Sequence, residues 1–210
     1  MSEKYLKEYE ASYNPRTVML EASRCLLCHD APCSKSCPAG TDPAKFIRSV
    51  RFQNVKGAAE TVRVNNILGA ICARVCPTER YCQQGCSRSG IDKPIDIGGI
   101  QRYITDSEDA FKMNILEKKP ANGKKVAVIG SGPAGLSTAG YLALEGFEVV
   151  VYEQDAKAGG YLRYGIPEYR LPTSVVDKEI KRIANLGVEF RLGQRVENLD
   201  ALKKEYDAVV

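Results

Sequence analysis

The sequence predicts two folds in one chain, an α-helical domain followed by a truncated α/β domain of the Rossmann type. All eight cysteines fall between Cys25 and Cys86, and none follows in the rest of the 210 residues. No alternation of apolar and polar residues, which is typical of strands, appears before residue 120. After that point short apolar runs alternate with helical patterns, as in a parallel sheet with crossover helices. We therefore expect two domains of different class.

The expected domain boundaries follow this change of pattern. We expect a helical domain over residues 1–115, a linker over residues 116–124 and the beginning of a Rossmann-type domain over residues 125–210. The linker region is polar and contains Pro120 and Gly123, which mark turns and loops.

Within the first domain, Thr41 and Asp42 before Pro43 predict the start of a helix, because a capping residue precedes a proline in the first turn. Two further helices are expected, one over about residues 55–68 and one around residues 97–104. The apolar face of the helix after Pro43 is expected to contain Phe46, Ile47, Val50 and Phe52.

The second domain begins with the pattern of a βαβ unit. We expect a strand over 126–129, a helix over 133–144 and a strand over 147–152. A helix over about 174–186 and a strand near Val188 continue the alternation. The last residues, 206–210, have a strand pattern, so we expect the sequence to be part of a longer protein.

Composition excludes several functional classes. The net charge of +4 is spread along the chain without a dense Lys/Arg block, so no nucleic-acid partner is expected. No apolar run approaches the roughly 20 residues of a membrane helix, and the polar, acidic N-terminus does not have the pattern of a secretory signal. We expect a cytoplasmic protein without a membrane partner. In that compartment clustered cysteines indicate metal or redox chemistry rather than disulfides.

The spacing of the cysteines predicts two [4Fe–4S] clusters. The first run reads C-x2-C-x4-C-x3-C-P from Cys25, and the second reads C-x3-C-P-x4-C-x3-C from Cys72. Short spacings bring thiolates close together, and in ferredoxin-type runs the cysteine before the proline serves the other cluster. On that basis Cys25, Cys28 and Cys33 hold the first cluster. The second cluster is then held by Cys37, Cys76, Cys82 and Cys86.

This division leaves the first cluster one ligand short. The fourth ligand is Cys72 or a residue other than cysteine, and Cys72, one turn before Cys76, is interpreted as a buried core thiol. The alternative to iron is structural zinc, which pairs two short-spaced couples, often with histidine. The only histidine is His29, and the two Cys-Pro steps favour iron–sulfur ligation.

A dinucleotide-binding motif opens the second domain. The sequence after the first strand is GSGPAG, in which Gly130 makes the tight turn, Gly132 admits a pyrophosphate and Gly135 lets the helix pack on the strand. The helix N-terminus then faces the phosphates. Glu153 follows the second strand, where an acidic side chain binds ribose hydroxyls. The alternative is a glycine-rich turn without a ligand.

We predict that this dinucleotide is FAD rather than a nicotinamide, because Glu153 is followed by a second pair of glycines. The candidate cofactor-binding residues are Gly130, Ser131, Gly132, Pro133, Ala134, Gly135, Glu153, Gln154, Gly159, Gly160, Tyr161, Leu162, Arg170 and Val196.

The motifs resemble a known family. GSGPAG and VVVYEQDAKAGGYLRYGIPEYRLP are similar to the FAD half of the glutamate synthase small-subunit superfamily. ASRCLLCHDAPCSKSCPAGTDPAKFIRSVRFQN, GAICARVCPTERYCQQGC and KPIDIGGIQRYITD resemble most the NADH-oxidising subunits of bacterial NAD-dependent dihydropyrimidine dehydrogenases. The resemblance runs from about Ala22 to Val210.

The resemblance implies an electron-input subunit. A nicotinamide cofactor reduces FAD, two [4Fe–4S] clusters carry single electrons away, and a partner subunit with FMN and iron–sulfur clusters reduces uracil or thymine. It also implies that Gln101 is the missing ligand of the first cluster and that Arg170 contacts the flavin. The family's second glycine motif, which binds NAD(P)H, is absent from this sequence, so these residues alone are not expected to turn over.

Two other functions are kept as alternatives. One is the small chain of glutamate synthase or a related flavin–iron–sulfur transhydrogenase, against which the IGGIQ segment argues. The other is a zinc scaffold without catalytic activity. The sequence leaves the final electron acceptor and the choice between NADH and NADPH open.

Overall fold

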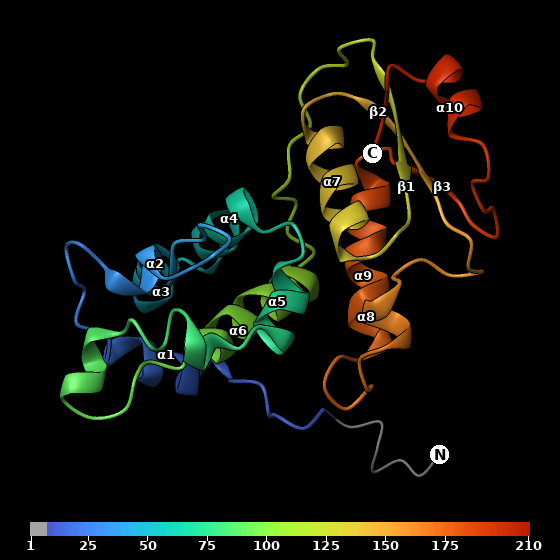
Figure 1. The fold of residues 1–210 in the computed structure, drawn as a ribbon. Helices are drawn as coiled ribbons and strands as arrows, with labels where there is room; N and C mark the ends of the chain where they lie inside the picture. The colour runs from blue at the N-terminus through green and yellow to red at the C-terminus, as the bar shows by residue number, and fades with distance from the viewer. Residues whose placement is uncertain (1–7) are drawn as a thin grey trace. The chain divides into compact units, whose positions relative to one another are not determined.

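The structure is a computed structural model that describes residues 8–210. The described chain forms two compact units (Figure 1). One unit is Glu10–Ile115, and the other contains Leu116–Val210 together with the end of the N-terminal segment.

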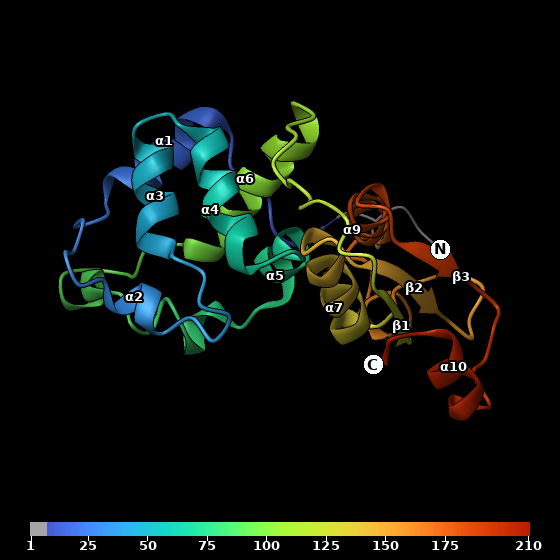
Figure 2. The ribbon, with the colours of Figure 1, turned by 90° about the horizontal axis from the view of Figure 1, so that it is seen from above.

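The first unit is entirely helical in its regular structure. The helices are α1 (Pro15–Ser23), α2 (Pro32–Lys35), α3 (Pro43–Arg51), α4 (Val55–Asn65), α5 (Gly69–Val75) and α6 (Ile97–Ala110), with short 3₁₀ helices at Thr78–Arg80 and Ser87–Gly90. Helices α3 and α4 lie side by side (Figures 1 and 2), and α6 packs against both α4 and α5.

The start of α3 confirms the predicted cap. The Asp42 side chain accepts a hydrogen bond from the Lys45 backbone N–H at 3.0 Å, which satisfies one of the free donors of the first turn. Phe46, Ile47 and Val50 are buried in the core of the unit, as the apolar spacing predicts. Phe52 differs, since it follows the last helical residue and is 71% exposed.

The expected helix over 55–68 is divided in the structure. Helix α4 ends at Asn65, where Asn66 leaves the helical conformation with ψ of 84°, and α5 begins at Gly69. A β-carbon on Gly69 would meet Val62, so the glycine permits the close packing of the two short helices. Because the chain leaves the helical conformation between α4 and α5, the helix α5, which carries Cys72, is a separate helix rather than a continuation of α4.

The second unit is a four-stranded parallel sheet of order β3-β2-β1-β4. The strands are β1 (Lys125–Ile129), β2 (Glu148–Tyr152), β3 (Glu189–Arg191) and β4 (Ala208–Val209). The helices are α7 (Pro133–Leu144), α8 (Tyr161–Tyr164), α9 (Thr173–Asn185) and α10 (Leu199–Glu205). This is a Rossmann-type arrangement, in which β1 is central and the GSGPAG loop lies at its carboxyl end.

Helices cover both faces of the sheet, α7 and α9 on one and α10 on the other (Figure 1). Successive side chains of a strand point to opposite faces. Ala127 and Val150 therefore belong to one buried cluster with Leu202 of α10, while Val128 approaches Gly135 of α7 on the other face.

Residues 116–124, predicted as a linker, pack on the second unit. The Lys119 N–H donates to the Leu144 carbonyl at 2.9 Å, and the Asn122 N–H donates to the Gly146 carbonyl at 3.1 Å. A β-carbon on Gly146 would collide with the Pro120 carbonyl oxygen. The segment thus covers the end of α7 even though its residues are polar.

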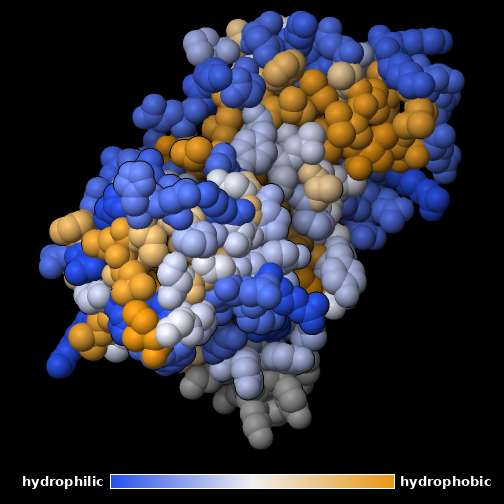
Figure 3. Space-filling view, turned by 60° about the vertical axis from the view of Figure 1, so that its left-hand side comes forward, coloured by the Kyte–Doolittle hydropathy of each residue, from blue (hydrophilic) through white to orange (hydrophobic). Residues whose placement is uncertain are grey.

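Large apolar side chains also reach the surface of the helical unit. Leu20, Leu26 and Ile91 are exposed. Figure 3 shows areas of hydrophobic residues among hydrophilic ones on the face of the molecule that it views. Single exposed apolar residues are normal for a globular protein. Among the described residues, no helix has the length and apolarity to cross a membrane.

Candidate cofactor sites

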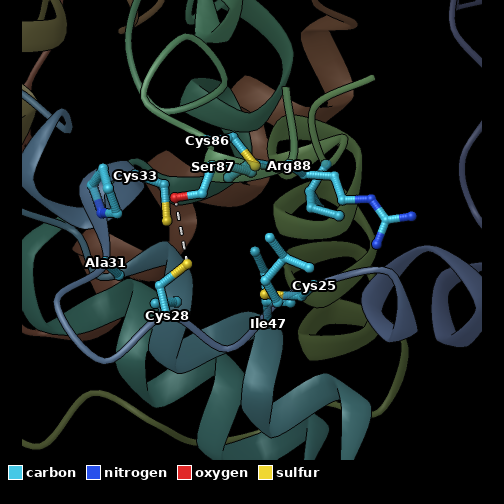
Figure 4. A pocket seen from close by; sticks show the side chains of 13 residues that line it. Cys25, Cys28, Ala31, Cys33, Ile47, Cys86, Ser87 and Arg88 are labelled. Atoms are coloured by element: carbon cyan, nitrogen blue, oxygen red, sulfur yellow. Dashed lines mark hydrogen bonds between the residues drawn. The ribbon is translucent and has the colours of Figure 1, made fainter. Parts of the chain in front are cut away.

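Four cysteines from three segments line one pocket of the helical unit. Cys25, Cys28, Cys33 and Cys86 share it with apolar residues that include Ile47, Ile95 and Ile97. Figure 4 shows the sulfur atoms of Cys28, Cys33 and Cys86 directed toward a common space. All four side chains are half-buried. The pocket therefore presents four sulfur ligands to one group.

Gly85 explains how Cys86 reaches this pocket. A β-carbon at Gly85 would collide with the Ser36 hydroxyl and lie 3.0 Å from the Pro32 carbonyl oxygen. The absence of a side chain therefore lets the Tyr81–Cys86 turn pack directly on α2, which carries Cys33.

Backbone and side-chain donors face the sulfurs of this group. Burial raises the pKa of the Cys25 thiol, and a hydrogen bond from the Leu27 backbone N–H partly offsets this. Leu27 has a left-handed conformation with φ of 54°, which is rare for leucine. Burial also raises the pKa of Cys33, and hydrogen bonds from Ser34 oppose that effect. Donors that favour a thiolate are therefore already in place.

The other four cysteines form a second group. Burial, with smaller contributions from the neighbouring Cys76 and Cys37, raises the pKa of Cys82 to about 12. Burial likewise raises the pKa of Cys76, followed by the effects of Cys72 and Cys37. Cys72 is half-buried, so its interpretation as a buried core thiol is wrong. Cys72 lies on α5 one turn before Cys76, and it is close enough to Cys76 to affect the pKa of that thiol.

Gln101 lies against helix α5. Its amide nitrogen donates to the Gly69 carbonyl on α5 at 2.8 Å, and the side chain is buried. Helix α5 also carries Cys72 and ends just before Cys76. With the nitrogen engaged, the carbonyl oxygen of Gln101 is the atom left to bind a metal.

The arrangement differs from the predicted division at two residues. Cys86 was expected with Cys37, Cys76 and Cys82, but it lies with the first group. Gln101 was expected to complete the first group, but it lies against α5. The pocket of the first group therefore contains four cysteines.

The donor set fits two iron–sulfur clusters. A cubane takes four ligands, usually thiolates, and the eight cysteines form two groups of four. Among residues 8–210, no three His, Cys, Asp or Glu side chains are grouped closely enough for a single metal ion.

In the second unit, the glycine loop has the predicted geometry. A β-carbon on Gly135 would collide with the Gly130 carbonyl oxygen, so the helix packs tightly on the turn. Gly130 has φ of 93°, and the space beside Gly132 is open. The second glycine pair supports this loop: Gly159 N–H donates to the Ser131 carbonyl at 3.1 Å. A β-carbon on Gly160 would lie 2.9 Å from Gly132 Cα.

Glu153 is buried and hydrogen-bonded to the same loop. Its Oε2 accepts from the Ser131 backbone N–H at 2.8 Å and also from the Ser131 hydroxyl. Its Oε1 accepts from the Asp155 N–H at 2.9 Å. Burial alone would raise the pKa of Glu153, but these hydrogen bonds outweigh it and hold the pKa below its usual value. The carboxylate is thus ionised and fixed in orientation.

A pocket of about 370 Å³ lies at the carboxyl ends of β1 and β2. Five predicted residues line it: Gly130, Glu153, Gln154, Gly160 and Val196. Ser131, Pro133 and Ala134 form the adjoining loop and first turn of α7, while Tyr161, Leu162 and Arg170 do not line this pocket. The pocket is also lined by residues that the sequence motifs did not predict: Ile129, Tyr152, Asp155, Gln194 and Arg195. The signal for Gln194 and Arg195 is their position after β3, because parallel strands end at one edge.

The fold and sites define a class: a cysteine-rich helical domain suited to iron–sulfur clusters, joined to a dinucleotide-binding domain. The comparisons with known proteins agree. The chain belongs to the family described as dihydropyrimidine dehydrogenase domain II, 4Fe-4S cluster, whose model matches residues 2–113. A second model, the NAD(P)-binding Rossmann-like domain, matches residues 128–180.

Several relatives match almost the whole chain. The NAD-dependent dihydropyrimidine dehydrogenase subunit PreT of Salmonella typhimurium is 55% identical over 98% of this chain and 51% of its own length. The Escherichia coli K12 protein of that name is 54% identical over the same shares. The glutamate synthase [NADPH] small chain of Halomonas elongata is more distant, 35% identical over 98% of this chain and 44% of its own. The chain thus spans about half the length of these relatives.

One solved structure, that of 6-hydroxypseudooxynicotine amine oxidase from Pseudomonas geniculata, aligns with 77% of this chain and 22% of its own chain. The two share 19% identity, with a TM-score of 0.37.

Proposed function

We propose that this chain is the electron-input part of an oxidoreductase of the NAD-dependent dihydropyrimidine dehydrogenase type. Electrons pass from NAD(P)H, bound outside these residues, through FAD and two [4Fe–4S] clusters to a partner subunit. That partner carries FMN and iron–sulfur clusters and reduces uracil or thymine. The observation that carries the proposal is the separation of the eight cysteines into two groups of four, on a chain that also has a dinucleotide pocket.

The first cluster is held by Cys25, Cys28, Cys33 and Cys86. Their apolar surroundings, including Ile47, restrict water around the sulfurs. Such clusters supply one-electron transfer at a potential set by ligand type, hydrogen bonds and exposure. The N–H of Leu27 stabilises negative charge on Cys25 Sγ.

The second cluster is held by Cys37, Cys76 and Cys82, with Gln101 or Cys72 as the fourth ligand. Gln101 is favoured by the resemblance, and its amide nitrogen is already fixed by Gly69. Cys72 is favoured by its proximity to Cys76.

FAD is held by the GSGPAG loop, with its pyrophosphate at the N-terminus of α7 and its adenosine ribose beside Glu153. In the longer protein Glu153→Ala should weaken flavin binding tenfold or more, because each lost hydrogen bond to a charged acceptor contributes roughly 1.5–3 kcal/mol. Flavin occupancy equal to that of the unmodified protein would contradict this role.

Cysteine variants test the ligand groups. After anaerobic reconstitution of the chain, Cys86→Ala should remove the same electron paramagnetic resonance signal as Cys28→Ala. Cys82→Ala should remove the same signal as Cys37→Ala. If Cys86→Ala instead removed the signal that Cys37→Ala removes, the grouping proposed from the structure would be wrong.

Two alternatives remain with their own tests. A glutamate synthase small chain is favoured by the 35% identity to the Halomonas elongata protein, and a pyrimidine-reducing partner encoded beside this chain would argue against it. A zinc scaffold would be colourless, whereas [4Fe–4S] clusters absorb visible light.

A further inference from the structure

We infer that Ser87 sets the reduction potential of the first cluster by donating a hydrogen bond to the sulfur of Cys28. The inference rests on the proposed function. Ser87 would be a positioning residue, since it acts through Cys28 rather than binding iron itself.

The two side chains are in contact. Cys28 Sγ and Ser87 Oγ are 3.5 Å apart, and the dashed line in Figure 4 joins them. In the structure the thiol is the donor and the hydroxyl is the acceptor. An iron-bound cysteine is a thiolate without a proton, so it can only accept. The serine hydroxyl must then reverse its role and donate to the sulfur.

The position of Ser87 is fixed by its neighbours. It is the first residue of the 3₁₀ helix Ser87–Gly90, directly after the ligand Cys86. Arg88 donates to the Arg24 carbonyl at 2.9 Å and pairs with Asp92 at 2.8 Å. Arg24 also pairs with Asp92, at 3.0 Å. These contacts tie the short helix to the segment before Cys25 and hold the hydroxyl beside Cys28.

The hydrogen bond between Ser87 and Cys28 joins residues far apart in the sequence, unlike the other hydrogen bonds to the sulfurs of this group. The donors to Cys25 and Cys33 are on Leu27 and Ser34, close neighbours in the chain. Ser87 is 59 residues from Cys28. It therefore joins ligands from two segments of the first group.

We expect the hydrogen bond from Ser87 to raise the reduction potential of the first cluster. Reduction adds negative charge to the cluster, which a donor to sulfur stabilises more in the reduced form than in the oxidised form. Ser87 is exposed, so water competes for its hydroxyl and the effect is moderate. We expect removal of the hydroxyl to lower the ratio of reduced to oxidised first cluster, at a fixed potential, by about three- to tenfold. Tenfold corresponds to about 59 mV for one electron.

The test is a redox titration followed by electron paramagnetic resonance on the reconstituted chain. Three variants are compared: Ser87→Ala, which lacks the donor, Ser87→Thr, which keeps it, and Ser89→Ala, an exposed serine of the same short helix that does not line the pocket. The first cluster is identified as the signal lost in Cys28→Ala, and the second cluster is the internal reference.

Support requires a lower midpoint for the first cluster in Ser87→Ala alone, with the second cluster unchanged and Ser87→Thr like the unmodified chain. No shift, an equal shift of both clusters, or the same shift in Ser89→Ala would overturn the inference. Loss of the cluster in Ser87→Ala would also overturn it, because Ser87 would then be required for assembly. Fewer than two clusters in the unmodified chain would instead contradict the proposed function.

Discussion

Glu153→Gln should destabilise the second unit before any cofactor is considered. The carboxylate accepts two hydrogen bonds from Ser131 on one oxygen and one from Asp155 on the other, and it is 5% exposed. A glutamine keeps one acceptor oxygen, but its amide N–H₂ group then faces the donor of either Ser131 or Asp155 and cannot accept from it. Bonds to a charged acceptor contribute roughly 1.5–3 kcal/mol and neutral ones about 0.5–1.5 kcal/mol. We therefore expect Glu153→Gln to lower the free energy of unfolding of the second unit by roughly 2–4 kcal/mol.

The matched control is Glu148→Gln, at the start of strand β2, which ends just before Glu153. Glu148 pairs with Lys125 at 3.0 Å, but its side chain is 63% exposed. Exposed pairs contribute about 0–1 kcal/mol. The assay is hydrogen exchange of the β1 and β2 amides, which reports the opening free energy of this unit alone. Equal free energies for the two variants would refute the reasoning.

The effect should depend on pH. Burial raises the pKa of Glu153, but the hydrogen bonds from Ser131 and Asp155 outweigh burial and keep the pKa below its ordinary value of 4.5. A depressed pKa gives stability that is full above about pH 4.5 and is lost as the pH falls through the folded-state value. The difference between the unmodified chain and Glu153→Gln should therefore shrink in acid. A constant difference would mean that ionisation of Glu153 is irrelevant.

Three further predictions concern the helical unit. Gly85→Ala should abolish the electron paramagnetic resonance signal of the first cluster but not that of the second, because the β-carbon of the alanine would collide with residues of α2 and its C-terminal end. The control Gly90→Ala should keep both signals, because the space around Gly90 is open. Leu27→Gly should retain the first cluster and raise the thermal midpoint, because a left-handed residue costs leucine roughly 1–2 kcal/mol; a lower midpoint would contradict this. Gln101→Cys should lower the potential of the second cluster and Cys72→Ala should leave it unchanged; loss of that cluster in Cys72→Ala would make Cys72 the ligand.

Local patterns predicted much of the fold. The cap at Asp42, the strand before GSGPAG and the helix after it are encoded by neighbouring residues, and the structure confirms them. The division of the predicted helix over 55–68 was missed, because it depends on how Gly69 packs against Val62.

The grouping of the cysteines could not be predicted from spacing alone. Cys82 and Cys86 are four residues apart, so the sequence places them together. The turn between them directs Cys82 into the core and brings Cys86 to the pocket beside Cys33, through the contact of Gly85 with α2. That contact joins residues about 50 positions apart, which no local pattern reports.

The most direct test of the account is the iron and acid-labile sulfide content of the anaerobically reconstituted chain. Two [4Fe–4S] clusters predict about eight iron atoms and eight sulfides per chain. Four or fewer of each would remove one cluster from the account. One or two zinc ions per chain, without sulfide, would contradict it.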